Sequence, residues 1–220
     1  MRIRFIGHSC FLIEEGKYSL LFDPFITENP TATVKAADLN PTHIFVSHYH
    51  GDHRGDAVDI AKRTGAVVFT SFEVGNELDK SGINVIAGHI GGKAKTEFGS
   101  VKLFQALHGS GIAGGHACGF VVDLMGKKIY HAGDTGLTKD MELLWKQNID
   151  LALLPIGDFY TMGPEDALEA VKMIKPKYVI PMHYNTFPAI SQNPEAFKKA
   201  VEDETGVKAM VLKPGESMEL

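Results

Sequence analysis

Three histidines and one aspartate fall within six residues, at His48, His50, Asp52 and His53. They follow the apolar run 44–46, so their side chains are expected to leave the end of a buried strand and enter a loop, where binding and catalytic residues commonly lie. The first two histidines are two positions apart and can point the same way in an extended chain. Gly51 permits a sharp bend before the last two residues. Two neighbouring groups of ligands are therefore geometrically possible.

This cluster has two interpretations. A polar loop whose histidines face solvent is the better interpretation of one or two histidines. Three histidines and an aspartate at this density instead indicate a metal site, because neutral imidazole is the commonest metal ligand in proteins. A carboxylate adds the negative charge needed to hold a second divalent ion nearby.

The first part of the chain is predicted to be rich in short strands, because runs of β-branched and aromatic residues alternate with turn residues. The expected strands are Arg2 to Glu14, Tyr18 to Phe22, His43 to Ser47, Ala66 to Thr70 and Asn84 to Ala87. A helix is expected from Asp56 to Thr64, with Asp56 as N-cap and Gly65 as terminator. A weaker helix signal covers Glu73 to Lys80.

The second part begins with a predicted long antiparallel hairpin and then alternates strands with helices. The hairpin covers Thr96 to Leu107 and Gly119 to His131, the latter broken by a turn at Gly126-Lys127. Further strands are expected at Leu151 to Pro155, Tyr178 to Pro181 and Lys208 to Leu212, and helices at Thr138 to Gln147, Pro164 to Lys175 and Pro194 to Thr205. This order predicts an α/β (α+β) fold, a mixed β-sandwich with helices outside, as a single domain of residues 1–220.

Composition excludes several classes of function. The formal net charge is −5 and no block of Lys and Arg stands out, so no nucleic-acid partner is expected. No apolar stretch suits a membrane span, and the strand-like start lacks the features of a signal peptide, so a cytoplasmic location is expected. Cys10 and Cys118 are too few for a disulfide framework and are expected to be buried free thiols, although one bridge stays open.

The cluster has the spacing His-x-His-x-Asp-His, in which it resembles the metallo-β-lactamase superfamily. Other parts of the family pattern appear in order along nearly the whole chain: Asp23 after a strand, His108 after a strand, Asp134 in Ala-Gly-Asp-Thr and His183 in Pro-Met-His-Tyr. The resemblance implies an αββα sandwich of two mixed sheets flanked by helices.

The resemblance also implies a set of metal ligands. One ion takes His48, His50 and His108, the other takes Asp52, His53 and His183, and Asp134 bridges them. Each ion then has three protein ligands and a shared carboxylate, which leaves positions for water, as catalytic sites require. The ligands suit two divalent ions, with Zn preferred and Mn or Fe as alternatives. Asp23 either orients a ligand imidazole or caps its own turn.

Three further segments resemble a narrower family, the metal-dependent hydrolases related to ascorbate-6-phosphate lactonase, whose substrates are largely unassigned. They are residues 7–11, 131–136 and 182–186. Zinc β-lactamases carry cysteine at the position of Asp134, so antibiotic hydrolysis is not expected. Flavodiiron oxidoreductases have an acidic residue in place of His50 and an added flavin domain, which disfavours electron transfer.

The expected function is hydrolysis of an ester, lactone or phosphoester by a hydroxide bound to two metal ions. The substrate is expected to be a small molecule, with anionic compounds included. Asp52 would orient the nucleophile. The alternatives are a catalytically silent metal-dependent binding or sensor protein, and a phosphodiesterase or nuclease of the same superfamily.

Other residues near the predicted strand ends are candidates for a role in catalysis. His8 lies between two strand-like runs and belongs to neither metal group; it is either an interior hydrogen-bonded histidine or a proton donor to the leaving group. The glycine-rich loop 109–115 is either a mobile lip or a plain hairpin loop. Asp158, Tyr160 and Thr161 follow a predicted strand on the same edge and are candidate substrate contacts.

Overall fold

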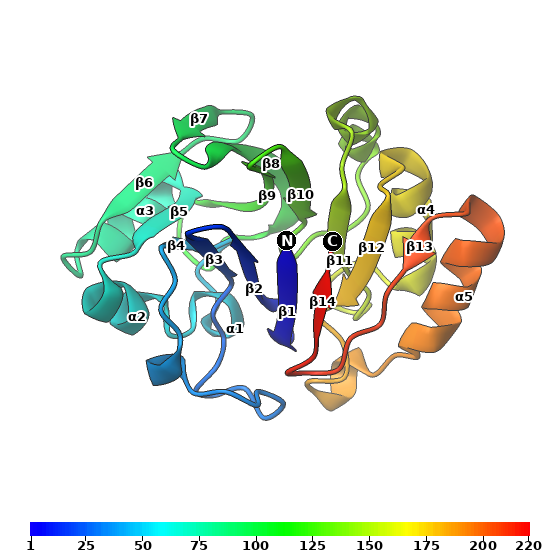
Figure 1. Cartoon of the computed structure of the whole chain (residues 1–220), viewed down its shortest axis with the longest axis horizontal. Coiled ribbons are helices and arrows are strands. Elements are labelled where there is room, and N and C mark those ends of the chain that lie inside the picture. The colour runs from blue at the N-terminus through cyan, green and yellow to red at the C-terminus, as the bar shows by residue number, and fades with distance from the viewer.

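Two seven-stranded sheets form the centre of the computed structural model, which describes residues 1–220 (Figure 1). The first sheet has the order β14-β1-β2-β3-β4-β5-β6, with β14 (Ser217–Glu219), β1 (Arg2–Gly7), β2 (Cys10–Glu15), β3 (Tyr18–Phe22), β4 (His43–Phe45), β5 (Val67–Ser71) and β6 (Val85–Gly88). The second has the order β13-β12-β11-β10-β9-β8-β7, with β13 (Lys208–Ala209), β12 (Tyr178–Met182), β11 (Leu151–Pro155), β10 (Lys127–His131), β9 (His116–Leu124), β8 (Gly99–Gly109) and β7 (Lys93–Thr96).

Each sheet is antiparallel in one half and parallel in the other. In the first sheet the pairs from β14 to β3 are antiparallel and those from β3 to β6 are parallel. In the second sheet the pairs from β7 to β10 are antiparallel and those from β10 to β13 are parallel. The two sheets are therefore mixed, as predicted.

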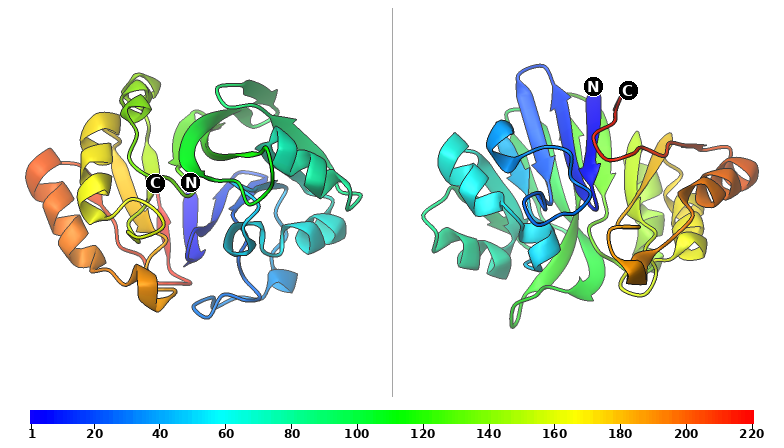
Figure 2. Two further views of the ribbon diagram at one scale, coloured as in Figure 1. Left: turned by 180° about the vertical axis from the view of Figure 1, so that it is seen from behind. Right: turned by 90° about the horizontal axis from the view of Figure 1, so that it is seen from below.

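Helices cover the outer faces of the two sheets (Figure 2). The α-helices are α1 (Gly51–Arg54), α2 (Ala57–Thr64), α3 (Phe72–Asp79), α4 (Pro164–Ile174) and α5 (Pro194–Thr205), and the 3₁₀-helices are η1 (Ala36–Asp38), η2 (Lys139–Gln147) and η3 (Pro188–Ile190). α2 and α3 pack on β5 of the first sheet, whereas α5 packs on β13 and against α4 beside the second. The layers are helix, sheet, sheet, helix, which confirms the predicted αββα sandwich.

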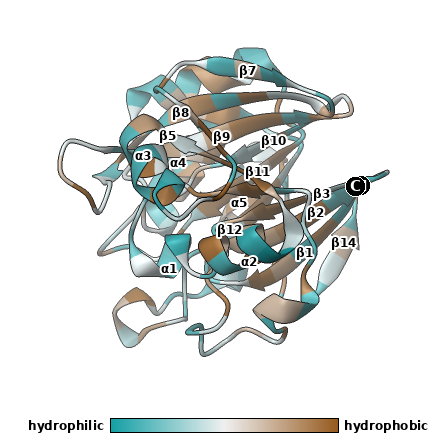
Figure 3. Cartoon of the chain, turned by 90° about the vertical axis from the view of Figure 1, so that its left-hand side faces the viewer, coloured by the Kyte–Doolittle hydropathy of each residue, from teal (hydrophilic) through white to brown (hydrophobic).

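The main core lies between the two sheets and is rich in aromatic rings. Phe22 stacks on Phe45 with ring centroids 4.5 Å apart, and Phe45 stacks on Phe69 at 5.3 Å. Phe120 of the second sheet meets Phe45 edge to face, so the sheets interlock. A smaller core lies beneath α2 and α3. In Figure 3 the strands inside the sandwich are largely hydrophobic, whereas the helices outside are mixed. No helix is both long and apolar enough to cross a lipid bilayer.

Most predicted elements are present, and three have bounds identical to the prediction: β3, β11 and α5. The predicted strand from Arg2 to Glu14 is wrong, because the chain turns at Gly7 (φ 137°) and His8 (φ 58°) to form two antiparallel strands. Residues 139–147 form a 3₁₀-helix rather than an α-helix, and the strand expected at 208–212 has two residues. β7, β14 and α1 were not predicted. Both cysteines are buried free thiols, as expected.

Asp56 occupies the predicted N-cap position of α2, but its side chain makes no capping hydrogen bond. Its carboxylate instead accepts hydrogen bonds from the backbone N–H groups of Ile26 and Thr27 and from the Thr27 hydroxyl. Asp56 therefore ties the loop after β3 to the start of α2. α5 has a true cap, because Asn193 accepts from the backbone N–H groups of Glu195 and Ala196.

Candidate metal centre

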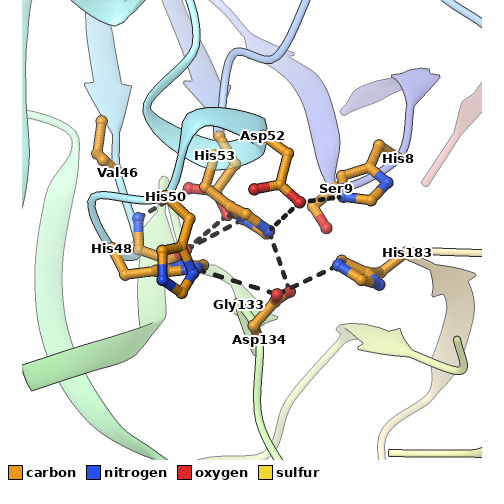
Figure 4. Close-up of polar contacts among 12 residues, drawn as sticks. His8, Ser9, Val46, His48, His50, Asp52, His53, Gly133, Asp134 and His183 are labelled. Carbon is orange, nitrogen blue, oxygen red and sulfur yellow. Dashed lines mark hydrogen bonds and ion pairs between the residues drawn. The ribbon is translucent and has the colours of Figure 1, made fainter. Parts of the chain in front are cut away.

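The polar residues predicted from the sequence meet at one edge of the sandwich. His48 follows β4, Asp134 follows β10 and His183 follows β12, and each of these strands has parallel neighbours. Carboxyl ends of parallel strands lie on the same edge of a sheet, which is where ligands bind in such folds. His8 reaches the same edge from the turn between β1 and β2, and His108 lies near the end of β8. Figure 4 shows most of these side chains pointing toward one another.

A one-turn helix, α1, carries two members of the motif. Asp52 and His53 lie in this helix, and His50 precedes it at the N-cap position. The helix ends at Gly55, which has φ 39°, and a Cβ there would lie 2.2 Å from the carbonyl oxygen of Pro24. Only glycine permits this close approach, which seats α1 against the loop after β3.

The first ligand group is His48, His50 and His108. One ring nitrogen from each lies within 4.8 Å of those of the other two. His48 Nε2 is 2.9 Å from His50 Nδ1, and the ring of His108 stands edge to face against both other rings. The structure brings together the three residues that the resemblance assigns to one ion.

The second ligand group is Asp52, His53 and His183, and the structure adds His8 beside it. Ligand atoms of these four residues lie within 4.8 Å of one another. His8 Nε2 donates a hydrogen bond of 3.2 Å to Asp52 Oδ2, and its Nδ1 is 2.9 Å from the Thr186 hydroxyl. The ring of His8 also lies 4.1 Å from that of His183. Sequence reasoning kept His8 apart from both groups, whereas the fold places it in contact with the second.

Asp134 lies between the two groups. Its Oδ1 is 3.1 Å from His53 Nε2, and its Oδ2 is 3.1 Å from His183 Nε2. The same Oδ2 is 3.6 Å from His108 Nε2 and 4.0 Å from His48 Nε2. One carboxylate thus faces two imidazoles of each group, which is the arrangement that a bridging ligand needs.

Asp23 orients the imidazole of His53 from behind. The Asp23 carboxylate accepts a hydrogen bond of 2.7 Å from His53 Nδ1, so that Nε2 points toward Asp134 and the centre. Asp23 also accepts from the backbone N–H and the hydroxyl of Ser47. Of the two roles considered from sequence, the geometry matches orientation of a ligand imidazole.

Burial and neighbouring charges favour the metal-binding forms of most of these side chains. His53 is the exception, because Asp134 and Asp23 outweigh burial and raise its pKa well above the usual range. Burial lowers the pKa of His48, which keeps its imidazole neutral. Burial alone would raise the pKa of Asp134, but His53 and His183 outweigh it and hold that pKa well below the usual range. For Asp52 the hydrogen bond from His8 likewise outweighs burial and lowers the pKa. Burial lowers the pKa of His8 to about 4.

Two buried polar atoms at the centre test whether these residues fit metal ions. His53 Nε2 and Asp134 Oδ1 are buried and lie 3.1 Å apart, but neither makes a hydrogen bond. Burying such atoms without a partner costs free energy, so they need a ligand that accepts lone pairs from both. A divalent cation meets this need, and imidazole nitrogens with carboxylate oxygens are the donors that Zn, Mn and Fe accept. The residues therefore fit the expected ions.

A pocket of about 570 Å³ opens over the centre. Its lining consists of five residues from the proposed ligand set, His50, Asp52, His108, Asp134 and His183, and four others, Tyr160, Phe187, Pro188 and Ala189. Of the three candidate substrate contacts, Tyr160 lines the pocket and the other two do not. Phe187, Pro188 and Ala189 were missed, since an apolar tripeptide has no pattern that distinguishes a pocket wall from a core.

The glycine-rich loop after β8 is braced against the motif. The Ser110 carbonyl accepts a hydrogen bond from the Tyr49 backbone, and the Ser110 hydroxyl donates to the Ile112 carbonyl. A Cβ at Gly111 (φ 80°) would lie 2.9 Å from the His50 ring. These contacts make the start of the loop a support for His50, and they occupy the only hydroxyl of the loop.

Similar proteins agree with this geometry. The model of the β-lactamase superfamily domain matches residues 2–183. A UPF0173 metal-dependent hydrolase from Symbiobacterium thermophilum is 53% identical over 224 residues, and the match covers 100% of both chains. Another from Natranaerobius thermophilus is 48% identical over 221 residues, again with 100% of both chains covered.

Among solved structures, a metallo hydrolase from the hyperthermophilic archaeon Ignicoccus hospitalis is similar over nearly its full length. The identity is 38% and the TM-score 0.94, with 100% of this chain and 98% of the other covered. These matches confirm the resemblance to the superfamily and the fold that it implies. The narrower likeness to ascorbate-6-phosphate lactonase is not shown by them.

Proposed function

Because the chain belongs to the metallo-β-lactamase superfamily and is a metal-dependent hydrolase, we propose that it hydrolyses a small ester, lactone or phosphoester at a centre of two divalent ions. The observation that carries the proposal is the position of Asp134, whose two oxygens face imidazoles of both ligand groups at 3.1 to 4.0 Å. A single ion would leave the imidazoles of one group without a cation.

The proposed ligands keep the division that the resemblance implies. His48, His50 and His108 hold one ion, Asp52, His53 and His183 hold the other, and Asp134 bridges them. Zn is the preferred ion because the donors are nitrogen and oxygen without thiolate, and Mn and Fe fit the same donors. The pocket volume of about 570 Å³ suits a small molecule rather than a polymer.

Two divalent ions in this position would supply a hydroxide nucleophile near neutral pH, because coordination lowers the pKa of water from 15.7 to about 7. The protein supplies orientation. Asp52 lines the pocket and its carboxylate can accept a hydrogen bond from the nucleophile while His8 fixes its rotamer. His8 holds a proton at Nε2 in the direction of Asp52, and Thr186 anchors the opposite nitrogen. We assign to His8 the orientation of Asp52, because with a pKa of about 4 its imidazole is neutral near pH 7 and its single proton stays in the hydrogen bond to Asp52.

The test combines a count of ions with an assay. Protein stripped of metal and reloaded with Zn or Mn would be analysed for ions per chain, and each form would be assayed with several lactones, a thioester and a phosphodiester. We expect about two ions per chain and turnover only in the loaded forms. At most one ion per chain would refute the dinuclear centre. Two ions without turnover on any substrate would favour the alternative of a binding or sensor protein.

A further inference from the structure

The wall of the pocket that faces the proposed ligands is apolar. Besides those ligands, the lining consists of Tyr160, Phe187, Pro188 and Ala189. No lysine or arginine is among the lining residues. The centre can therefore attract negative charge at the scissile bond, but the surrounding wall has no side-chain cation for a second anionic group of the substrate.

Three aromatic side chains near this wall are exposed to solvent. Phe159 is 76% exposed, Tyr160 54% and Phe187 38%. The first two belong to the loop between β11 and α4, and the third belongs to the loop between β12 and η3. β11 and β12 are paired neighbours, so the two loops leave the same edge of the sheet side by side. Apolar side chains gathered at a pocket with polar groups at its floor are typical of a ligand site.

The turn that presents Tyr160 is strained and firmly held. Asp158 and Phe159 have φ of 63° and 28°, two successive left-handed residues that are not glycine. Such a conformation costs free energy and persists where the surroundings impose it. Backbone hydrogen bonds from Asp158 to Met162 and from Met162 to Thr135 impose it here, and the Met162 side chain is fully buried. Tyr160 is thus held at the pocket by a rigid turn.

Phe187 is fixed by contacts with other rings. It stands edge to face against His8, with centroids 5.6 Å apart, and lies 6.4 Å from Phe25. Its remaining surface is open to the pocket. A substrate group lying on this ring would therefore be next to His8 and to the second ligand group.

From these observations we infer that the pocket selects substrates with an uncharged apolar group, aromatic or branched alkyl, next to the scissile bond, and that Tyr160 and Phe187 determine this selectivity. The inference rests on the proposed hydrolytic function. A phosphorylated or carboxylated substituent in the same place would lose water without gaining a cationic partner, which costs binding free energy. Esters and lactones with apolar substituents are thus the substrate class.

The test compares matched substrates in matched variants of the metal-loaded protein. Phenyl butanoate is compared with methyl acetate and with phenyl hydrogen succinate, in the wild type, Tyr160→Ala, Phe187→Ala and Phe187→Leu. The wild type should prefer phenyl butanoate. Phe187→Ala should lower kcat/KM for it by about 10- to 100-fold, the usual effect of losing an apolar contact in a pocket, and by more than it lowers kcat/KM for methyl acetate. The loss should appear mainly in KM, and Phe187→Leu should restore part of it.

Phe72→Ala is the control, because Phe72 is an aromatic residue with a similar exposed fraction, 42%, that lies on α3 and outside the pocket. Ions per chain should equal those of the wild type in every variant. Equal turnover of all three esters, or variants that leave the preference unchanged, would overturn the inference while leaving the hydrolase intact.

Binding of acetophenone, an inert aromatic ketone, gives a readout without turnover. An NMR titration of acetophenone should reach saturation with the loaded wild type. The affinity for acetophenone should be at least tenfold lower in Phe187→Ala. If no ester is hydrolysed and acetophenone still binds in this way, the proposed function fails and the apolar selectivity stands. Absence of binding to the wild type would count against the selectivity.

Discussion

Asp134 is the residue on which the two ligand groups depend together, because its carboxylate is the only one that faces imidazoles of both. Asp134→Asn keeps the volume of the side chain and removes its negative charge. We expect both metal affinity and turnover to fall by more than the 10- to 100-fold that loss of an orienting partner costs. Elemental analysis after dialysis would measure the first effect. Two ions retained per chain would show that Asp134 is not the bridge.

His8 is predicted to affect turnover without affecting ion content. In His8→Ala the Asp52 carboxylate loses a hydrogen bond of 3.2 Å, but His53 and His183 keep their places. Turnover should fall by roughly 10- to 100-fold, the usual cost of losing a partner that orients a ligand, while the ion count stays at two. His8→Gln, which keeps a hydrogen-bond donor, is the matched control for the contact with Asp52. Loss of an ion in His8→Ala would identify His8 as a ligand instead.

Local sequence could predict only part of the site. His48, His50, Asp52 and His53 are dense enough to identify a metal site on their own. His108, Asp134 and His183 are each isolated in sequence, so they became candidates only through resemblance to a family pattern. The contact of His8 with Asp52 was beyond prediction, because it depends on how the turn between β1 and β2 meets the helix α1, 44 residues away.

At the scale of elements, Asn193 is predicted to contribute to stability alone. Its side chain accepts two hydrogen bonds from the first turn of α5, and this helix contributes no residue to the centre. Asn193→Ala should lower the free energy of unfolding by about 0.5–2 kcal/mol, as loss of an N-cap does, with ion content and turnover unchanged. Thermal or urea denaturation would measure it. A change in ion content would contradict the separation of α5 from the site.

Elements were predictable where the sequence pattern is long. α5 has a cap signal, Pro194 in the first turn and a clear apolar face, and its bounds were predicted as observed. β7 and β14 were missed because they are short and partly exposed, and they owe their form to pairing with β8 and β1 rather than to composition. Residues 139–147 satisfied the helix pattern, but composition does not distinguish the 3₁₀ from the α form over so short a segment.

At the scale of the whole molecule, removal of metal should lower thermal stability. The proposed ligands come from both sheets, and bound ions stabilise only the folded chain, by RT ln(1 + [L]/Kd). With free ion at 100 times Kd, the free energy of unfolding rises by about 2.7 kcal/mol for each site. Scanning calorimetry of stripped and reloaded protein should show a Tm that rises with ion concentration. A Tm independent of added Zn or Mn would mean that the centre binds no ion in the folded state.

The joining of two sheets at one centre has a further consequence, since His53 reaches Asp134 from the opposite sheet. Ion binding and the packing of the sheets are then thermodynamically coupled. A substitution in the core such as Phe120→Ala should therefore weaken ion binding, although Phe120 is not a proposed ligand. In a cell short of the ion, the loosened sandwich would open more often and be degraded sooner by proteases. The supply of the metal ion would then determine how much of the protein remains in the cell as well as the turnover rate of each molecule.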